Sequence, residues 1–303
     1  MSFLLGIIPP VVTPLKANNQ LDADGLEKLI EHIQSGGVHG LFILGTTGEG
    51  PSLSYDLRNE VTERVCSQVD GNVPVLVGIT DTSFTESIQL SKKAADVGAE
   101  AVVAAPPYYF STNQAELTNY FELLANESPL PLFLYNMPSH TKVHFEPRTV
   151  RNLADHPNII GFKDSSGDLL YFQNIVRLLQ DHPEFSLLVG PEEMLMQTML
   201  TGGHGGVNGG ANMFPKLYVA MYEAVLEQDF ERMSSLQGKI LQISSSLYTV
   251  GNSPASYLQG VKCALSVMGI CNDTLALPYR SFGDEERKVI EKSLKQIDLE
   301  DVL

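Results

Sequence analysis

Lys163 is the residue whose surroundings most clearly indicate chemistry. It follows residues 158–162, an apolar run with the composition of a buried strand. A buried lysine is costly unless it is paired, so such a residue either gives up its proton or has a dedicated partner. An unprotonated amine can form an imine with a ketone, which at pH 7 requires a pKa well below the usual value near 10.4. The alternative is a lysine that reaches solvent from the strand end or pairs with a nearby acid.

Asp164, the next residue, is not automatically the counter-ion of this lysine. Successive side chains of a strand point to opposite faces, so Ile159, Gly161 and Lys163 share one face while Asp164 points to the other. The sequence therefore leaves the partner of the amine open.

A loop rich in glycine and threonine forms the second candidate site. Residues 45–50, with the sequence Gly-Thr-Thr-Gly-Glu-Gly, follow the apolar run 40–44. The glycines suit a tight loop whose backbone amides face an anion, and a hydroxyl of Thr46 or Thr47 is available to pass a proton. The segment is not a P-loop, because the Gly-x4-Gly-Lys-Ser/Thr spacing is missing. The alternative is a turn that only connects a strand to a helix.

Tyr135 forms the third candidate. It stands in the apolar run 131–135 and shares a face with Phe133 by the alternation of a strand. If this strand neighbours the one that carries Lys163, the phenol and the amine enter the same space, and Tyr135 can act as general acid and base. The alternative is an aromatic core residue whose hydroxyl bonds a carbonyl.

Two further segments are unusual. Tyr108 and Tyr109 are adjacent, so both are not expected in the core, and one should face solvent, a ligand or another subunit. The glycine-rich segment 202–210 allows a close backbone approach at the eighth apolar run, where barrels often bind phosphate. Tight packing against the following helix is the alternative for that segment.

Neither a metal nor another cofactor is expected. His140 and His144 are four residues apart, but they stand in a predicted loop, where this spacing does not bring two imidazoles together, and no carboxylate stands beside them. Cys66, Cys263 and Cys271 show no metal-ligand spacing and no disulfide framework.

Charge and hydropathy exclude several classes of partner. The formal net charge is −16, and nothing concentrates lysine or arginine into a patch, which argues against nucleic acid and anionic membranes. Residues 1–10 lack a positive region and contain two prolines, so they make a poor signal peptide. No apolar segment is long enough to cross a bilayer. A cytoplasmic location is therefore expected.

The elements that must position these residues follow an alternating pattern. Short apolar runs are separated by segments of helical periodicity, such as Leu26, Leu29, Ile30 and Ile33. Eight such units predict an α/β protein of the (β/α)8 TIM barrel class, in which the carboxyl ends of the strands carry the chemistry. A doubly wound sheet is the competitor, but the Gly-x-Gly-x-x-Gly fingerprint after the first strand is absent. The runs begin near Ile7, Gly40, Pro74, Ala101, Pro131, Asn158, Phe185 and Gly205.

Strand patterns cease after Pro215, and the remaining chain has the periodicity of several consecutive helices. We therefore predict two parts, a catalytic barrel over residues 1–225 and a C-terminal helical extension over residues 226–303. The extension is a candidate oligomerisation surface.

Four segments together resemble one enzyme family. Residues 45–49, 135–138, 161–164 and 202–205 are similar, in order and spacing, to the dihydrodipicolinate synthase and N-acetylneuraminate lyase family of pyruvate-dependent class I aldolases. The resemblance covers nearly the whole chain. It implies a barrel with C-terminal helices, assembled as a homotetramer.

The resemblance also implies roles for individual residues. Lys163 matches the Schiff-base lysine, Tyr135 the proton-shuttling phenol and Thr46 the relay hydroxyl beside it. Tyr109 matches a tyrosine that reaches into the neighbouring subunit's site, and Thr47 matches the site of the pyruvate carboxylate. The substrate-binding positions expected in this way are Gly45, Thr47, His140, Gly190, Glu192, Glu193, Val207 and Gly209.

The resemblance does not settle the substrate. Dihydrodipicolinate synthases carry an arginine shortly after the tyrosine motif, and His140 stands at that position here, so a fixed bidentate cation is lost. Glu192 and Glu193 follow Gly190 where similar lyases hold the hydroxyls of a sugar chain, although two acidic residues can also simply open a helix. The serine that sialic acid lyases use near Gly209 is missing.

These comparisons favour a lyase that reversibly cleaves a 2-keto-3-deoxy sugar acid, or an N-acetylneuraminate-like substrate, to pyruvate and an aldehyde. Alternatives within the family are a dehydratase of such an acid and a condensation like that of dihydrodipicolinate synthase. An alternative of another class is a non-catalytic sugar-acid sensor, which would bind the ligand without covalent capture. A metal-dependent aldolase is the remaining alternative.

Overall fold

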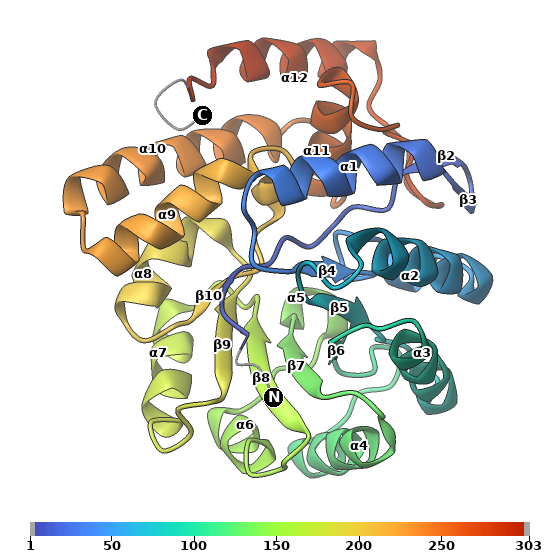
Figure 1. Ribbon diagram of the computed structural model, residues 1–303, viewed down its shortest axis with the longest axis vertical. Helices are drawn as coiled ribbons and strands as arrows, with labels where there is room; N and C mark the ends of the chain where they lie inside the picture. The colour runs from blue at the N-terminus through green and yellow to red at the C-terminus, as the bar shows by residue number, and fades with distance from the viewer. Residues whose placement is uncertain (1–3, 300–303) are drawn as a thin grey trace.

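The computed structural model describes residues 4–299, and its centre is an eight-stranded parallel barrel (Figure 1). The strand order is β1-β10-β9-β8-β7-β6-β5-β4, and a bridge between Pro10 and Phe42 brings the two outer strands together. The (β/α)8 prediction is confirmed, and each strand begins within about one residue of its predicted start. The strands are β1 (Gly6–Ile7), β4 (Leu41–Ile43), β5 (Val75–Gly78), β6 (Ala101–Ala104), β7 (Leu132–Asn136), β8 (Ile159–Asp164), β9 (Ser186–Val189) and β10 (Gly205–Gly206).

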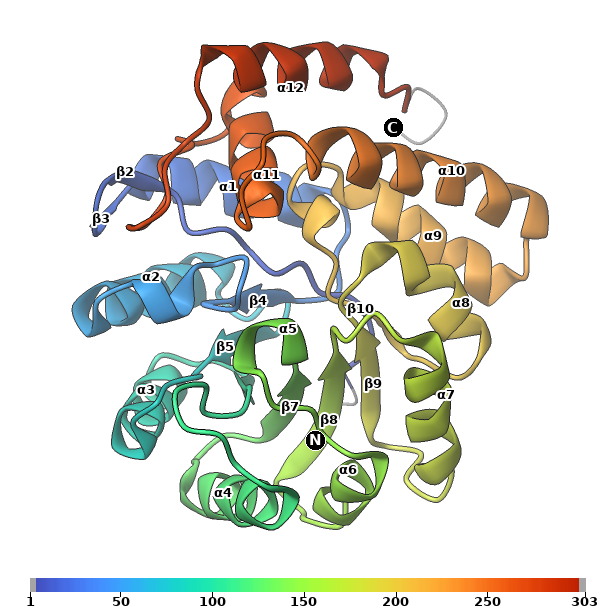
Figure 2. The ribbon, with the colours of Figure 1, turned by 180° about the vertical axis from the view of Figure 1, so that it is seen from behind.

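Helices follow the strands and form the outer layer of the barrel (Figure 2). Side-chain caps explain several of their starts: Ser54, for example, accepts a hydrogen bond from the Leu57 amide at the start of α2. A short antiparallel hairpin, β2 (Leu15–Ala17) with β3 (Gln20–Leu21), was not predicted, because its strands are too short to show alternation. The helices are α1 (Ala23–Ser35), α2 (Tyr55–Val69), α3 (Phe84–Asp96), α4 (Gln114–Glu127), α5 (Pro138–Thr141), α6 (Pro147–Leu153), α7 (Leu169–Leu178), α8 (Leu195–Leu200) and α9 (Pro215–Glu227).

The barrel separates two apolar cores. The larger core fills the space between the strands and the surrounding helices. The smaller core lies inside the barrel and includes Phe42, Phe133 and Tyr135, which the alternation of each strand turns inward. Tyr135 and Phe133 therefore share a face, as predicted.

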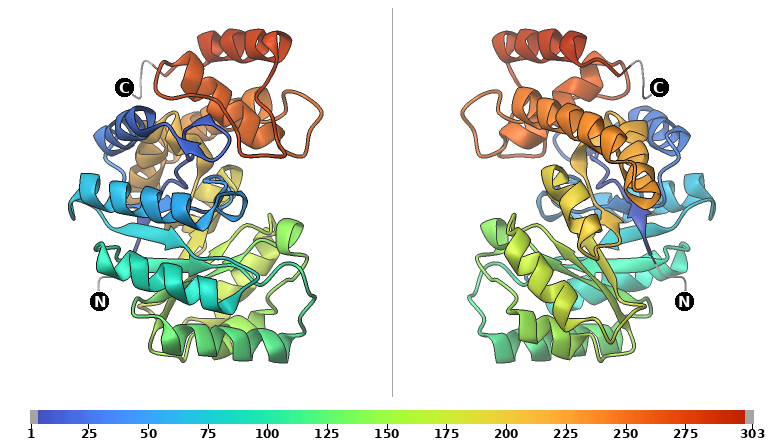
Figure 3. Two further views of the ribbon diagram at one scale, coloured as in Figure 1. Left: turned by 90° about the vertical axis from the view of Figure 1, so that its right-hand side faces the viewer. Right: turned by 90° about the vertical axis from the view of Figure 1, so that its left-hand side faces the viewer.

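The C-terminal extension gathers on the side of the barrel that carries α1 and α9 (Figure 3). It consists of α10 (Phe230–Leu247), α11 (Ser256–Val267) and α12 (Asp284–Gln296). The predicted boundary after residue 225 falls in the last turn of α9. Among the residues described, no helix combines the length and the apolar character that a membrane crossing requires.

A buried ion pair ties this extension to the barrel. The ammonium of Lys262 on α11 contacts the carboxylate of Glu49 in the loop after β4, and both side chains are almost completely buried. The Lys262 Nζ also donates to the carbonyl of Thr274 at 2.8 Å, and Glu49 accepts from the Ala276 amide at 2.7 Å. Removing either charge would leave the other buried without an opposite charge, so the contact fixes where α11 meets the barrel.

Candidate active site

Lys163 and Tyr135 lie side by side on neighbouring strands. They are direct partners in the register of β7 and β8. The Lys163 Nζ lies 3.6 Å from the centre of the Tyr135 ring and 5.8 Å from that of Phe42, and the residue is 6% exposed. The amine is therefore held against aromatic faces inside the barrel.

The hydroxyl of Ser165 is hydrogen-bonded to this amine. The Lys163 Nζ donates to the Ser165 Oγ at 3.1 Å. The Asp164 carboxylate lies on the opposite face, as alternation predicts, where it accepts from the Asn136 Nδ2 and the Ser166 Oγ, each at 2.8 Å. A hydroxyl thus takes the place that a carboxylate would occupy beside the amine.

Gly190 makes room for that hydroxyl. A Cβ at this position would lie 2.0 Å from the Ser165 Oγ. Gly190 was among the predicted site residues and Ser165 was not, although the serine follows Lys163 by two residues and so lies on the same side of the chain.

Thr46 completes the polar contacts of Tyr135. Its Oγ1 lies 3.2 Å from the Tyr135 hydroxyl. Burial by itself raises the pKa of Tyr135, but the positive charge of Lys163 and the hydrogen bonds of Thr46 and neighbouring groups outweigh it, so the pKa lies below its usual value. The phenol is thus prepared to give up its proton.

The loop that carries Thr46 and Thr47 has a strained backbone. Leu44 and Glu49, at its two ends, have positive φ values of 57° and 56°. A Cβ at Gly50 would lie 2.1 Å from the Leu44 carbonyl oxygen, so only glycine allows this approach. At Gly45, a Cβ would lie 2.5 Å from the Phe42 ring. The glycines therefore let the loop fold tightly over the barrel mouth.

The glycine-rich segment provides a buried floor beside this loop. Val207 belongs to the core inside the barrel. A Cβ at Gly209 would lie 1.8 Å from the Tyr257 hydroxyl, so the missing side chain makes room for a phenol from α11. Tyr257 was not among the predicted site residues, because nothing in the local pattern of α11 indicates such a contact.

Glu192 is already occupied by protein donors. Its Oε1 accepts from the hydroxyls of Tyr218 at 2.5 Å and Tyr248 at 2.7 Å, and its Oε2 accepts from the Gly210 amide at 2.8 Å. The residue is 3% exposed, and burial raises its pKa to about 7 despite these hydrogen bonds. In this arrangement its oxygens are not free for substrate hydroxyls, whereas the side chain of Glu193 is half-buried.

His140 and Tyr109 lie at the surface, outside this buried group. The exposed His140 on α5 lies 3.0 Å through its Nδ1 from the Ser139 Oγ, and partial desolvation with the charges of Lys142 and Lys163 lowers its pKa. It is thus a mainly neutral group at pH 7. Tyr109 is 78% exposed and its ring meets that of Phe110 edge-on.

Residues 4–299 contain no group of three or more histidine, cysteine, aspartate or glutamate side chains that could hold a metal ion.

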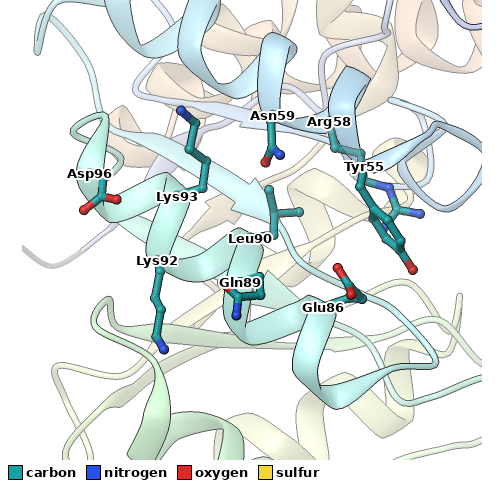
Figure 4. A pocket seen from close by; sticks show the side chains of 9 residues that line it. All are labelled: Tyr55, Arg58, Asn59, Glu86, Gln89, Leu90, Lys92, Lys93 and Asp96. Atoms are coloured by element: carbon teal, nitrogen blue, oxygen red, sulfur yellow. The ribbon is translucent and has the colours of Figure 1, made fainter.

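A cavity of about 250 Å³ opens on the outer surface between α2 and α3 (Figure 4). It is lined by residues such as Tyr55, Arg58 and Lys93 and contains none of the predicted site residues.

The buried amine, the phenol beside it and the hydroxyl loop at the carboxyl ends of barrel strands define an enzyme of the Schiff-base aldolase type. Comparison with known proteins agrees with this class of enzyme. Residues 3–297 match the Dihydrodipicolinate synthetase family. The chain belongs to this family, whose members are pyruvate-dependent class I lyases or aldolases.

Three similar proteins illustrate the range of the family. A 4-hydroxy-tetrahydrodipicolinate synthase of Methanocaldococcus jannaschii is 35% identical over 97% of this chain and 99% of its own. A structure described as dihydrodipicolinate synthase from Bacteroides thetaiotaomicron is 55% identical, with a TM-score of 0.95, and covers 98% of this chain and 100% of its own. YagE of Escherichia coli K12, named a putative 2-dehydro-3-deoxy-D-gluconate aldolase, is 35% identical over 96% of each chain, and its structure with pyruvate has a TM-score of 0.93.

The burial of Glu192 predicts a pH dependence of stability. Its folded pKa of about 7 lies above the ordinary value of 4.5, so between these values the unfolded chain ionises this carboxyl before the folded chain does. The free energy of unfolding should therefore fall as the pH rises through this window, by about 3 kcal/mol from this group. Glu192→Gln, which can donate to both phenols and accept from Gly210, should flatten that slope in denaturant titrations at pH 4.5 and 7.5. The half-buried Glu193→Gln is the matched control; equal slopes in both variants would contradict the assignment.

Proposed function

We propose that this chain is a lyase that reversibly cleaves a 2-keto-3-deoxy sugar acid, or an N-acetylneuraminate-like substrate, to pyruvate and an aldehyde. One observation carries the proposal: the buried Lys163 amine lies against Tyr135 with a serine hydroxyl, and not a carboxylate, as its polar partner. An amine in that setting is available to a carbonyl carbon.

The reaction follows from the groups around the amine. The Lys163 Nζ attacks the keto carbon, and water leaves as the iminium forms. Tyr135 gives its proton to the departing hydroxyl as this water leaves, and the resulting phenolate then takes the proton of the C4 hydroxyl. The C3–C4 bond breaks, and its electron pair moves to the iminium to give an enamine while the aldehyde departs. The enamine gains a proton at C3, and water then hydrolyses the imine to release pyruvate and the free lysine. The Thr46 hydroxyl, which is hydrogen-bonded to that of Tyr135, passes protons to and from the phenol.

The carboxylate end of the substrate is assigned to the loop after β4. The net charge of −16 opposes an anion, so attraction must be local. We propose that the Thr47 hydroxyl and the amides near Gly45 supply it, because amides aimed at an anion in a water-excluded site act strongly.

The choice of substrate depends on the groups that would bind the end remote from the keto-acid carboxylate, and we propose His140 and Glu193 for that end. A neutral His140 in place of a guanidinium does not favour a second carboxylate, and the half-buried Glu193 can accept from hydroxyls. YagE, named for a 2-keto-3-deoxy sugar acid, is a similar protein. The occupied Glu192 does not add to this support. The 55% identity to a structure described as dihydrodipicolinate synthase favours condensation as the second candidate.

We further propose a cytoplasmic homotetramer in which Tyr109 meets a neighbouring subunit. Tyr109 and Phe110 are each 78% exposed and adjacent in the loop between β6 and α4. Two large exposed aromatic rings are typical of a protein contact, where burying them is favourable.

A substrate screen tests the proposed function. The enzyme is incubated with a panel of 2-keto-3-deoxy acids, with N-acetylneuraminate and with 4-hydroxy-tetrahydrodipicolinate precursors, and pyruvate release or consumption is followed with lactate dehydrogenase. We expect release of pyruvate from at least one sugar acid. A dehydratase would consume the acid without releasing pyruvate, and consumption of pyruvate only with aspartate semialdehyde would establish condensation instead.

Tyr135→Phe tests the role of the phenol. It should keep the fold, because the ring remains in the barrel core, and lose roughly 100-fold or more of kcat, because the proton carrier is removed. The control is Tyr171→Phe, whose hydroxyl donates to the Phe145 carbonyl on the outer side of the barrel at 2.8 Å. Turnover of Tyr135→Phe equal to that of the control would show that another group carries the proton.

A further inference from the structure

Helix α11 of the C-terminal extension touches the catalytic loop at two points. The Tyr257 hydroxyl lies 3.1 Å from the Thr47 Oγ1, and Lys262 forms the buried ion pair with Glu49. Two residues of α11, Tyr257 and Lys262, thus contact two residues of one loop, Thr47 and Glu49. The two contacts join segments that are more than 200 residues apart in the chain.

The surroundings of Tyr257 fix its hydroxyl in place. The Tyr248 ring packs against it edge-on, with ring centres 4.9 Å apart. The missing side chain at Gly209 leaves the space into which the hydroxyl fits. Burial, together with the nearby Glu192, raises the pKa of Tyr257. The phenol therefore stays protonated and can donate a hydrogen bond to the Thr47 Oγ1.

The ion pair holds the other end of the loop. Glu49 has a left-handed backbone, a conformation that persists in a residue other than glycine only where its surroundings enforce it. Lys262 and the Ala276 amide, both from the C-terminal part of the chain, bind its two carboxylate oxygens. The loop therefore depends on the extension for its shape.

We propose that Tyr257 is a positioning residue, which orients the Thr47 hydroxyl toward the keto-acid carboxylate so that the C-terminal extension sets the affinity for that end of the substrate. This inference rests on the proposed role of Thr47. A fixed hydroxyl has already lost the rotational freedom that a free one would lose on binding, so the held loop binds the carboxylate more tightly.

The test measures capture of pyruvate, which does not depend on the identity of the aldehyde. Wild type, Tyr257→Phe and the control Tyr171→Phe are treated with borohydride over a range of pyruvate concentrations, and the modified fraction is read by intact mass. We expect the half-saturating pyruvate concentration to rise about tenfold in Tyr257→Phe, with full modification at saturation, and to stay unchanged in Tyr171→Phe. An unchanged value in Tyr257→Phe would overturn the positioning role.

A double-variant comparison distinguishes positioning from loss of structure. In a Thr47→Val background, Tyr257→Phe should add no further effect, because the hydrogen bond is already gone. An equal tenfold rise in both backgrounds, or a thermal midpoint that falls in parallel with affinity, would mean that Tyr257 acts through the fold and not through Thr47. Absence of capture in wild type would instead reject the proposed function itself.

Discussion

The proposed reaction depends on the Lys163 amine, which is buried beside a hydroxyl and not beside a carboxylate. Two lysines are buried within residues 4–299, and their environments differ in this respect. Lys262 is enclosed by Glu49 and a backbone carbonyl, so its nitrogen has no direction from which a substrate can approach. Lys163 meets a serine hydroxyl and the faces of two rings. Both side chains carry the cost of desolvation, but only Lys163 can recover part of it by forming a covalent bond to a carbonyl.

The barrel supplies this environment through register and through missing side chains. Parallel pairing sets Lys163 directly beside Tyr135, and strand alternation turns both away from Asp164. Gly161 leaves room for the Phe133 ring, since a Cβ there would lie 2.2 Å from it, and Gly190 leaves room for Ser165. Small residues in the strands thus decide how closely large and polar side chains approach the amine.

Much of the fold was predictable because its pattern is local. Eight apolar runs and the helical periodicity between them repeat along the sequence, and the residues that close the runs at positions 46, 135 and 163 converge in space as a parallel barrel requires. Their convergence could therefore be anticipated from the sequence, whereas their roles came from the family resemblance and stay predictions.

The remaining contacts were not predictable, because they join segments that are distant in the chain. The pairing of Lys262 with Glu49 and that of Tyr257 with Thr47 cross more than 200 residues, and no periodicity relates them. Glu192 illustrates the same limit. Its place after β9 suggested a ligand for hydroxyls, but the donors that occupy it come from α9, from the residue that directly follows α10 and from the glycine-rich segment. Whether a polar residue is free or satisfied depends on such distant partners.

Identification of the lysine that pyruvate modifies tests the central claim most directly. The protein is reduced with borohydride in the presence of pyruvate, digested, and the peptides that carry Lys163 and Lys262 are sequenced by mass spectrometry. The account predicts a three-carbon adduct on Lys163 and an unmodified Lys262. An adduct on Lys262, or none on either lysine at saturating pyruvate, would contradict it.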